Sequence, residues 1–158
     1  MYSDYHAISN LAYTYTETMD AADHEGLARL FAHAEVYLMH DGPGGNRAPI
    51  TGAENLKGFW DGLVRLYDGK TRCRHCISNF LLEIDDKGET ASSRAYFNVF
   101  LQTPDIPLQV IASGRYHDEY KKIEGVWYFA KKRIMTDFFG VNITGHTKSL
   151  AWQLVEKA

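Results

Sequence analysis

The sequence predicts a single α+β domain, residues 1–158, in which three helices come first and an antiparallel sheet follows. Apolar side chains recur with a helical period in the first part of the chain. Beyond Gly69 the chain instead runs in long extended stretches between short turns. With 158 residues the chain is long enough to bury a real core. We expect a strongly bent sheet that wraps against the helices and leaves an internal cavity open at one end.

Apolar stripes predict the three helices. In the first segment, six side chains follow the i, i+3, i+4, i+7 spacing of one helix face: Ile8, Leu11, Ala12, Tyr15, Met19 and Ala22. Asp23 can cap a short second helix in "HEGLARLF". A third helix is predicted in "AENLKGFWDGLVRLY", whose apolar positions share a face: Leu56, Phe59, Trp60, Leu63 and Leu66.

Recognisable turns separate the extended stretches. The segment "AEVYLMH" follows the second helix, and four longer stretches cover approximately residues 72–84, 90–102, 107–120 and 126–136. The turns between these four contain "DDKG", "TPDIP" and "IEG", which indicates an antiparallel meander. The tail "TGHTKSLAWQLVEKA" is compatible with a terminal helix.

Composition and charge exclude several classes of function. The net charge is -3 and no run of Lys or Arg occurs, so neither nucleic acid nor an anionic membrane is expected as a partner. No apolar stretch approaches the roughly 20 residues of a membrane helix. The segment "MYSDYHAISN" lacks the features of a signal peptide, so we expect a cytoplasmic protein. The glycine-rich "DGPGGNRAPITG" lacks the Lys-Ser/Thr ending of a phosphate-binding loop.

The stretch "TRCRHCISNF" concentrates the reactive side chains. Cys73 and Cys76 match C-x-x-C, but the chain has only 2 cysteines, so a second half-site for zinc is absent. A redox pair normally lies at a helix N-terminus, whereas this segment has the character of a strand. On a strand, side chains three positions apart face opposite sides. We therefore expect two free thiols and no metal.

The same alternation places His75 in a mainly apolar row with Cys73, Ile77, Asn79 and Leu81. One interpretation is a core histidine whose hydrogen bonds are satisfied. The other is a general base, because the unperturbed pKa of histidine lies nearest neutrality. A base would need a carboxylate that orients the ring and stabilises the imidazolium.

Three segments together resemble the SnoaL-like branch of the nuclear-transport-factor-2-like superfamily: "LAYTYTETMDAADHEGLARLF", "RCRHCISNFLLEID" and "SGRYHDEYKKIEGVWYFAKKRIMTD". The resemblance runs from about Ile8 to Phe139. It implies a cone-shaped barrel of three N-terminal helices packed on a strongly curved antiparallel sheet around an apolar pocket. The branch is similar to scytalone dehydratase, bile-acid 7-alpha-dehydratase, lindane dehydrochlorinase and dioxygenase β subunits, so it includes enzymes and non-catalytic subunits.

The resemblance implies three catalytic residues. In lyase members a strand histidine pairs with an aspartate near the end of the first helix, and these match His75 and Asp20. A Tyr or Lys five residues before the aspartate matches Tyr15, which belongs to the apolar stripe and should face inward. Considered alone, Asp20 could be a solvated helix-end carboxylate and Tyr15 could be core packing.

Further residues are candidates for substrate binding. By resemblance, Asn98 lies close to an aspartate of the bile-acid enzyme, and Lys132 matches an arginine of the dehydrochlorinase. Asn98 could equally pair with backbone, and Lys132 could lie on a solvated face. Tyr116 and His117 alternate faces, so only one can look inward. Three aromatic side chains are expected in the pocket wall or the core: Tyr37, Trp60 and Phe97.

Three functions fit these observations. The first is a lyase or dehydratase, isomerase or cyclase that needs no cofactor or metal and acts on a small, mostly apolar cyclic compound. The second is a non-catalytic β subunit assembled with the α subunit of a ring-hydroxylating dioxygenase. The third is a binding module for a small ligand. In each case a broad sheet face remains uncovered, so we expect a homo-oligomer, a trimer in preference to a dimer.

Overall fold

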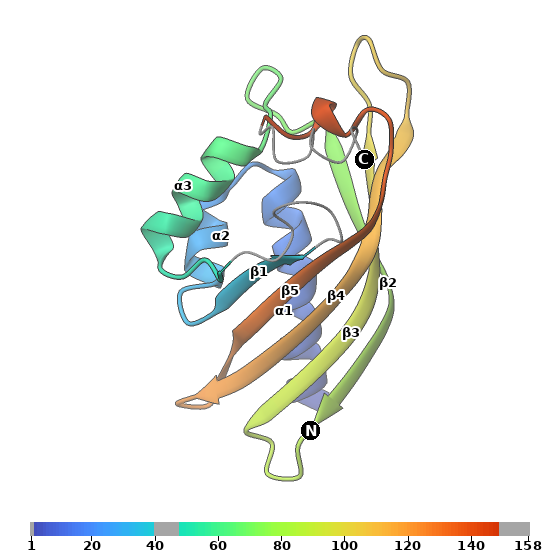
Figure 1. Cartoon of the computed structure of the whole chain (residues 1–158). Helices are drawn as coiled ribbons and strands as arrows, with labels where there is room; N and C mark the ends of the chain where they lie inside the picture. The colour runs from blue at the N-terminus through green and yellow to red at the C-terminus, as the bar shows by residue number, and fades with distance from the viewer. Residues whose placement is uncertain (1, 40–47, 149–158) are drawn as a thin grey trace.

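The computed structural model describes residues 2–39 and 48–148, and it has the predicted α+β class. Three helices, α1 (Tyr2–Asp20), α2 (His24–Leu30) and α3 (Ala53–Leu63), lie on the inner side of a curved five-stranded sheet (Figure 1). Within the described ranges, no helix is both long enough and apolar enough to span a bilayer.

The predicted antiparallel meander is confirmed, and a fifth strand that pairs parallel makes the sheet mixed. β2 (Cys73–Ile84), β3 (Thr90–Leu101), β4 (Gln109–Ile123) and β5 (Val126–Phe139) form the expected antiparallel meander. β1 (Glu35–Met39) joins at the far edge and pairs parallel with β5, giving the order β1-β5-β4-β3-β2. No tight turn connects β1 to β5 in the chain, so no hairpin forces an antiparallel pairing. Because β1 and β2 are both edges, the sheet curls but does not close into a barrel.

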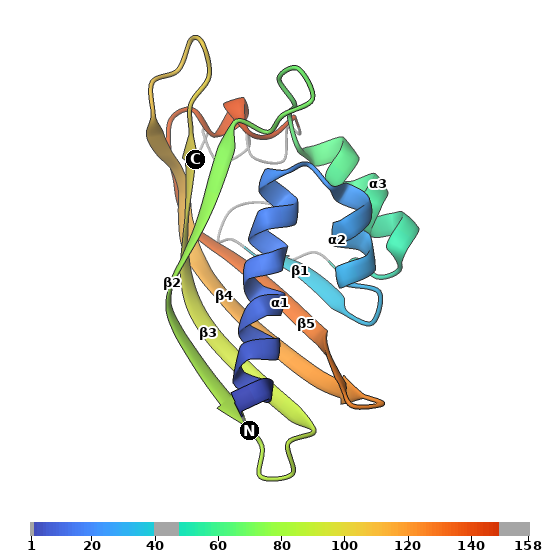
Figure 2. The same ribbon diagram turned by 180° about the vertical axis from the view of Figure 1, so that it is seen from behind.

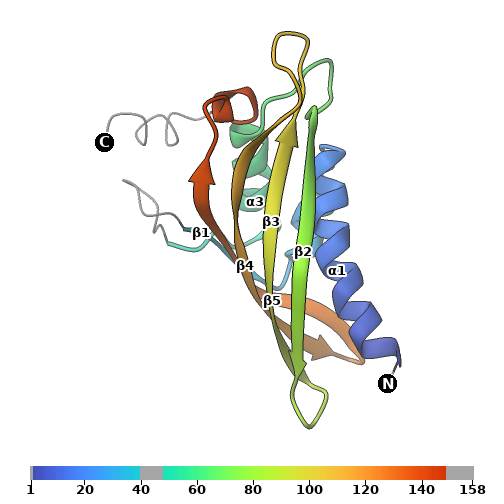
Figure 3. The same ribbon diagram turned by 90° about the vertical axis from the view of Figure 1, so that its right-hand side faces the viewer.

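The core lies between the helices and the inner face of the sheet. Figure 2 shows α1 running along the sheet, with α2 and α3 beside its C-terminal half. Along β3 the residues Ala91, Ser93, Ala95, Phe97, Val99 and Leu101 are buried in strict alternation, as expected of a strand with one face toward a core. The opposite face of β2, β3 and β4 carries no helix in the described part of the chain (Figure 3).

A β-bulge interrupts the predicted row of side chains on β2. Asn79 has a positive φ of 53°, and the pairing with β3 shifts register between Ser78 and Leu81. Because the extra residue reverses the alternation, Leu81 is 58% exposed instead of sharing the inner face with His75. The expectation that Asn79 and Leu81 share the face of His75 was therefore wrong, while Cys73 and His75 do point inward.

After β5 the chain returns to the end of α3. A short 3-10 helix, η1 (Ile143–Gly145), is followed by a bridge between Thr147 and Val64. Backbone hydrogen bonds join Arg65 N–H to the His146 carbonyl at 2.8 Å and Lys148 N–H to the Leu63 carbonyl at 2.7 Å. Residues 149–158 of the predicted terminal helix lie outside the described residues. This return places the segment around His146 against the inside of the domain.

Candidate active site

Asp20 is positioned by the end of α1. The helix stops there, and Ala22 takes a positive φ of 59° as the chain turns toward α2. The Thr71 hydroxyl donates a hydrogen bond to the Asp20 backbone carbonyl at 2.8 Å, which fixes the helix end against the start of β2. The Asp20 carboxylate is thereby directed at the first inward-facing residues of β2.

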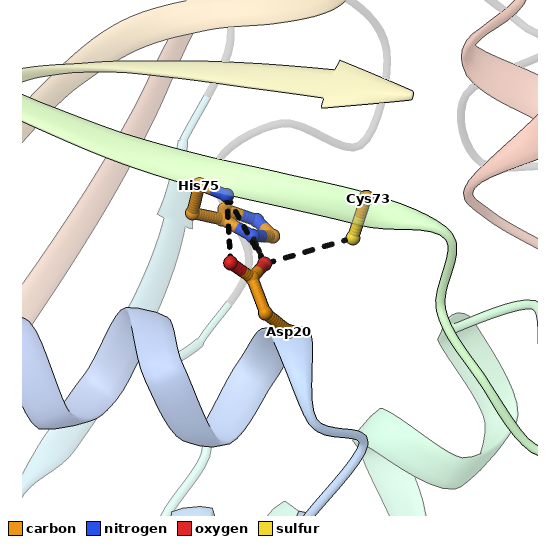
Figure 4. Close-up of side chains that lie close together, drawn as sticks. All are labelled: Asp20, Cys73 and His75. Carbon is orange, nitrogen blue, oxygen red and sulfur yellow. Dashed lines mark hydrogen bonds and ion pairs between the residues drawn. The ribbon is translucent and has the colours of Figure 1, made fainter. Parts of the chain in front are cut away.

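His75 contacts that carboxylate through two of its N–H groups (Figure 4). The ring Nδ1 lies 2.7 Å from Asp20 Oδ1, and because a carboxylate can only accept, Nδ1–H is the donor. The His75 backbone N–H lies 3.0 Å and 3.1 Å from the two carboxylate oxygens. The side chains are 5% and 7% exposed. The pair therefore has the buried, oriented geometry that general-base chemistry requires, with Nε2 as the nitrogen left for a substrate.

Cys73 and Arg74 complete the surroundings of the carboxylate. Cys73 Sγ lies 3.8 Å from Asp20 Oδ1, and Arg74 Nη1 lies 3.6 Å from Oδ2 at the exposed side. Burial, supported by the Asp20 charge, raises the pKa of the Cys73 thiol to about 12. The ligand atoms of Asp20, Cys73 and His75 lie within 4.8 Å of one another, a spacing that could hold a metal ion. Both cysteines are free, Cys73 buried and Cys76 exposed, as the strand alternation predicted.

His75 lines a pocket between the helices and the sheet. Sixteen described residues form its wall: Tyr15, Met19, Leu38, Trp60, Leu63, His75, Phe97, Val99, Ala112, Tyr116, Ile134, Thr136, Phe139, Ile143, His146 and Thr147. The cavity volume is about 60 Å³. This is below the roughly 300–1,000 Å³ of typical ligand pockets, so a ring compound must displace wall side chains when it enters. Among these described wall residues there is no Lys, Arg, Asp or Glu.

The family model of the SnoaL-like domain matches residues 1–133 of the chain. The chain belongs to the SnoaL-like domain family. No curated protein matches it. Among solved structures it is similar to Rv3472, a protein of unknown function from Mycobacterium tuberculosis, with 26% identity, a TM-score of 0.69, and coverage of 91% of this chain and 82% of that one.

Two further solved structures share the fold of this SnoaL-like domain. A candidate scytalone dehydratase from Novosphingobium aromaticivorans has 22% identity and a TM-score of 0.64, with 85% of each chain covered. The β subunit of a candidate aromatic-ring-hydroxylating dioxygenase from the same organism has 17% identity and a TM-score of 0.67, with 89% of this chain and 94% of that chain covered. At these identities the likeness concerns the fold alone.

Four of the other sequence candidates line the pocket of the SnoaL-like domain: Tyr15, Trp60, Phe97 and Tyr116. Tyr116 stacks on Phe97 with ring centroids 4.5 Å apart and meets the edge of Tyr15 at 5.6 Å. Burial raises the pKa of both tyrosines, and each hydroxyl interacts with the other. Tyr15 is therefore a neutral hydroxyl inside the pocket at any physiological pH.

Lys132 lies behind the pocket wall. Its Nζ forms an ion pair with Asp118 at 2.9 Å, and neither side chain exceeds 2% exposure. The same Nζ lies 3.7 Å from the Tyr116 ring centroid and 4.3 Å from that of Tyr15. Burial lowers the pKa of Lys132 and raises that of Asp118, and their contact opposes both effects. Lys132 therefore supports the two tyrosines from behind and does not line the cavity.

Asn98 and Tyr37 do not line the pocket. The expectation that these two residues contact the substrate was therefore wrong. Asn98 follows Phe97 on β3, so strand alternation directs it to the outer face of the sheet. The Tyr37 hydroxyl donates to Glu35 at 2.8 Å, and its ring lies 5.7 Å from the Arg133 guanidinium.

The sequence reasoning missed His146. Its ring lies 5.7 Å from that of His75, edge to face, and its side chain lines the same pocket. Burial, followed by the neighbouring His75, lowers the pKa of His146 to about 3. Nothing local in "TGHTKS" distinguishes this histidine, because its position depends on the backbone pairing with residues 63–65.

Proposed function

We propose that this SnoaL-like domain is a cofactor-independent lyase or isomerase that acts on a small, uncharged, mostly apolar cyclic compound. The observation that supports this most strongly is the 2.7 Å contact between His75 Nδ1 and Asp20 Oδ1. His75 also lines an apolar pocket. A core histidine needs neither a carboxylate nor a cavity. The absence of charged groups among the described wall residues favours a ligand that is itself uncharged.

In this proposal His75 Nε2 removes a proton from a ring carbon. The C–H bond breaks, its electron pair moves into the ring, and the proton stays on Nε2. Asp20 stabilises the resulting imidazolium, an interaction that is strong because water is largely excluded. In an isomerase the imidazolium returns the proton to another carbon. In a dehydratase it gives the proton to a departing hydroxyl group, which leaves as water.

Tyr15 has a supporting part in the proposal. Its neutral hydroxyl shares the pocket with His75 and can donate a hydrogen bond to an oxygen that gains negative charge. The interaction with Tyr116, which is held by the Phe97 stack, restricts where that hydroxyl can point. Asn98, a substrate-binding candidate from the sequence, lies on the outer face and cannot take this part.

Proton abstraction can be tested without the natural substrate. The purified protein is incubated in D₂O with cyclohexanone and a series of hydroxylated cyclic ketones, and NMR follows the loss of the α-proton signals and of any hydroxyl group. We expect protein-dependent exchange or dehydration for some members, abolished in His75→Ala and retained in His33→Leu, because His33 is exposed at the turn before β1. A wild-type rate no higher than that of His75→Ala would contradict the proposal.

The β-subunit role remains a second candidate, favoured by the match that covers 94% of a dioxygenase β subunit. Such a subunit would use the outer face of the sheet for assembly and would need neither His75 nor Asp20. Co-purification with a Rieske-type α subunit, unaffected by His75→Ala, would support this role. The binding-module hypothesis would be supported if ring compounds bind in the pocket but none of them is converted to a product.

A further inference from the structure

Two buried polar groups in the pocket wall have no hydrogen-bond partner. Among the described residues, neither Nδ1 of His146 nor Nε1 of Trp60 is paired, although the residues are only 7% and 2% exposed. A buried polar group left unpaired costs about 1–3 kcal/mol, so such groups usually have a purpose in a native structure. Both residues line the pocket that contains His75.

The two groups come from adjoining pieces of backbone. Trp60 lies in the last turn of α3, and its carbonyl accepts the N–H of Val64 at 2.9 Å. The next residues pair with the returning C-terminal segment, where Arg65 N–H donates to the His146 carbonyl at 2.8 Å. The α3 end and the His146 segment therefore form one hydrogen-bonded unit. That unit lies beside the base, because the His146 ring is 5.7 Å from the ring of His75.

The chemistry of these groups specifies what can pair with them. An indole N–H is a donor only, so its partner must be an acceptor. His146 is neutral and thus carries one ring N–H, because burial holds its pKa far below the usual range. A positive charge at His146 is not available to bind an anion. In the tautomer with the proton on Nδ1, His146 is a second donor, and the ligand atom complementary to both groups is then an uncharged oxygen acceptor such as a ring carbonyl.

We propose that His146 and Trp60 form an oxygen-binding subsite that selects cyclic ketones or their hydroxylated relatives as substrates. The inference deepens the proposed function and rests on it for the role of the bound oxygen during reaction. When His75 removes a proton from the carbon next to the carbonyl, the C–H electron pair forms a C=C bond. The carbonyl π pair then moves onto the oxygen as an enolate. A neutral imidazole N–H is a suitable donor to that oxygen, since its own proton need not leave.

Binding can be measured at the Trp60 indole itself. The probe is cyclohexanone, and the control ligand is methylenecyclohexane, which has a similar shape and no oxygen. In ¹H–¹⁵N spectra the indole signal of Trp60, assigned from Trp60→Phe, should move downfield with cyclohexanone and much less with methylenecyclohexane. Trp127 provides an internal reference, because its Nε1 already donates to Asp4 at 2.9 Å and its signal should stay in place.

Variants separate the two donors. His146→Leu and Trp60→Phe should each weaken cyclohexanone binding about tenfold, the cost of one lost hydrogen bond, and should change methylenecyclohexane binding less. His33→Leu is the matched histidine control and should bind both ligands as the wild type does. A Trp60 signal that does not respond to cyclohexanone would overturn the subsite. This holds if the probe binds elsewhere in the protein, if it does not bind, or if water stays hydrogen-bonded to the two donors.

This readout is independent of turnover. If His75→Ala still binds cyclohexanone through Trp60 while the wild type catalyses no exchange, the subsite stands and the proposed catalysis fails. If exchange occurs and is unaffected by His146→Leu and Trp60→Phe, the catalysis stands and the subsite is wrong.

Discussion

Cys73 and Cys76 show how strand alternation gives two cysteines three positions apart different chemistry. Cys73 faces inward beside Asp20, where burial raises the pKa of its thiol to about 12, while Cys76 is exposed on the outer face. Because the thiolate is the reactive form, Cys73 should resist alkylation at pH 8, where the pH is far below its pKa. Iodoacetamide labelling followed by mass spectrometry of the folded protein should therefore modify Cys76 and spare Cys73. Equal labelling of both under native conditions would contradict the buried site.

His146 should make the stability of the protein sensitive to acid. Its pKa is about 3 in the folded state, below the ordinary value of 6.5, so the unfolded chain binds the proton more readily. The stabilisation is complete above pH 6.5 and is lost as the pH falls toward 3. From pH 6.5 to 4.5 the loss should be roughly 2 kcal/mol. Urea unfolding at these two pH values should show a smaller loss in His146→Leu than in the wild type. An equal loss in both would mean that His146 is not buried in its neutral form.

At the scale of elements, local patterns predicted most of the site. The apolar stripe of α1 placed Tyr15 inward, and the two-residue period of β2 placed Cys73 and His75 inward. Asn98 faces outward between the buried Phe97 and Val99, whereas the family resemblance had suggested a place at the pocket. The bulge at Asn79, the parallel pairing of β1 and the position of His146 depend on contacts between distant segments. Such contacts cannot be predicted from the periodicity of a short segment.

The pairing of β4 with β5 depends on Gly114. A Cβ at this position would meet the Met135 carbonyl oxygen at 2.0 Å and the Phe97 ring at 2.8 Å. Gly114→Ala should therefore push the strands apart, disturb the ring that Tyr116 stacks on, and destabilise the protein by about 1–3 kcal/mol. Gly58→Ala is the matched control, since nothing lies within 4 Å of its Cβ and it sits inside α3. That change should stabilise the protein by about 0.5–1 kcal/mol in urea unfolding. Equal effects at the two glycines would contradict the close strand approach.

At the scale of the whole molecule, the outer face of the sheet is the surface available for assembly. No described helix covers it, and Leu81 and Tyr96 are 58% and 53% exposed there. We expect a homo-oligomer, a trimer in preference to a dimer, in light scattering at micromolar concentration. Tyr96→Glu should shift the mass toward the monomer, because burying a charge in the interface is costly. Tyr13→Glu, at a similarly exposed site on α1, should leave the mass unchanged. A monomeric wild type would refute the assembly.

The enzyme and the β-subunit hypotheses differ in what the whole molecule has to preserve. An enzyme depends on the inner pocket and the contact between Asp20 and His75, whereas a β subunit depends on the outer face. Variants on one side of the sheet should therefore affect one function and spare the other. The enzyme hypothesis therefore requires that Asp20 and His75 act as one catalytic unit.

The most direct test of that claim is the rate of α-proton exchange in His75→Ala, Asp20→Asn and the double variant, with the ketone that the wild type exchanges fastest. Asp20→Asn keeps the shape of the carboxylate but removes its charge, so a loss of several orders of magnitude is expected, on the order of 10⁴. Because the two residues act as one unit, the double variant should lose little more than His75→Ala alone. Losses that multiply fully would show that Asp20 and His75 act independently, which would contradict the proposed catalytic pair.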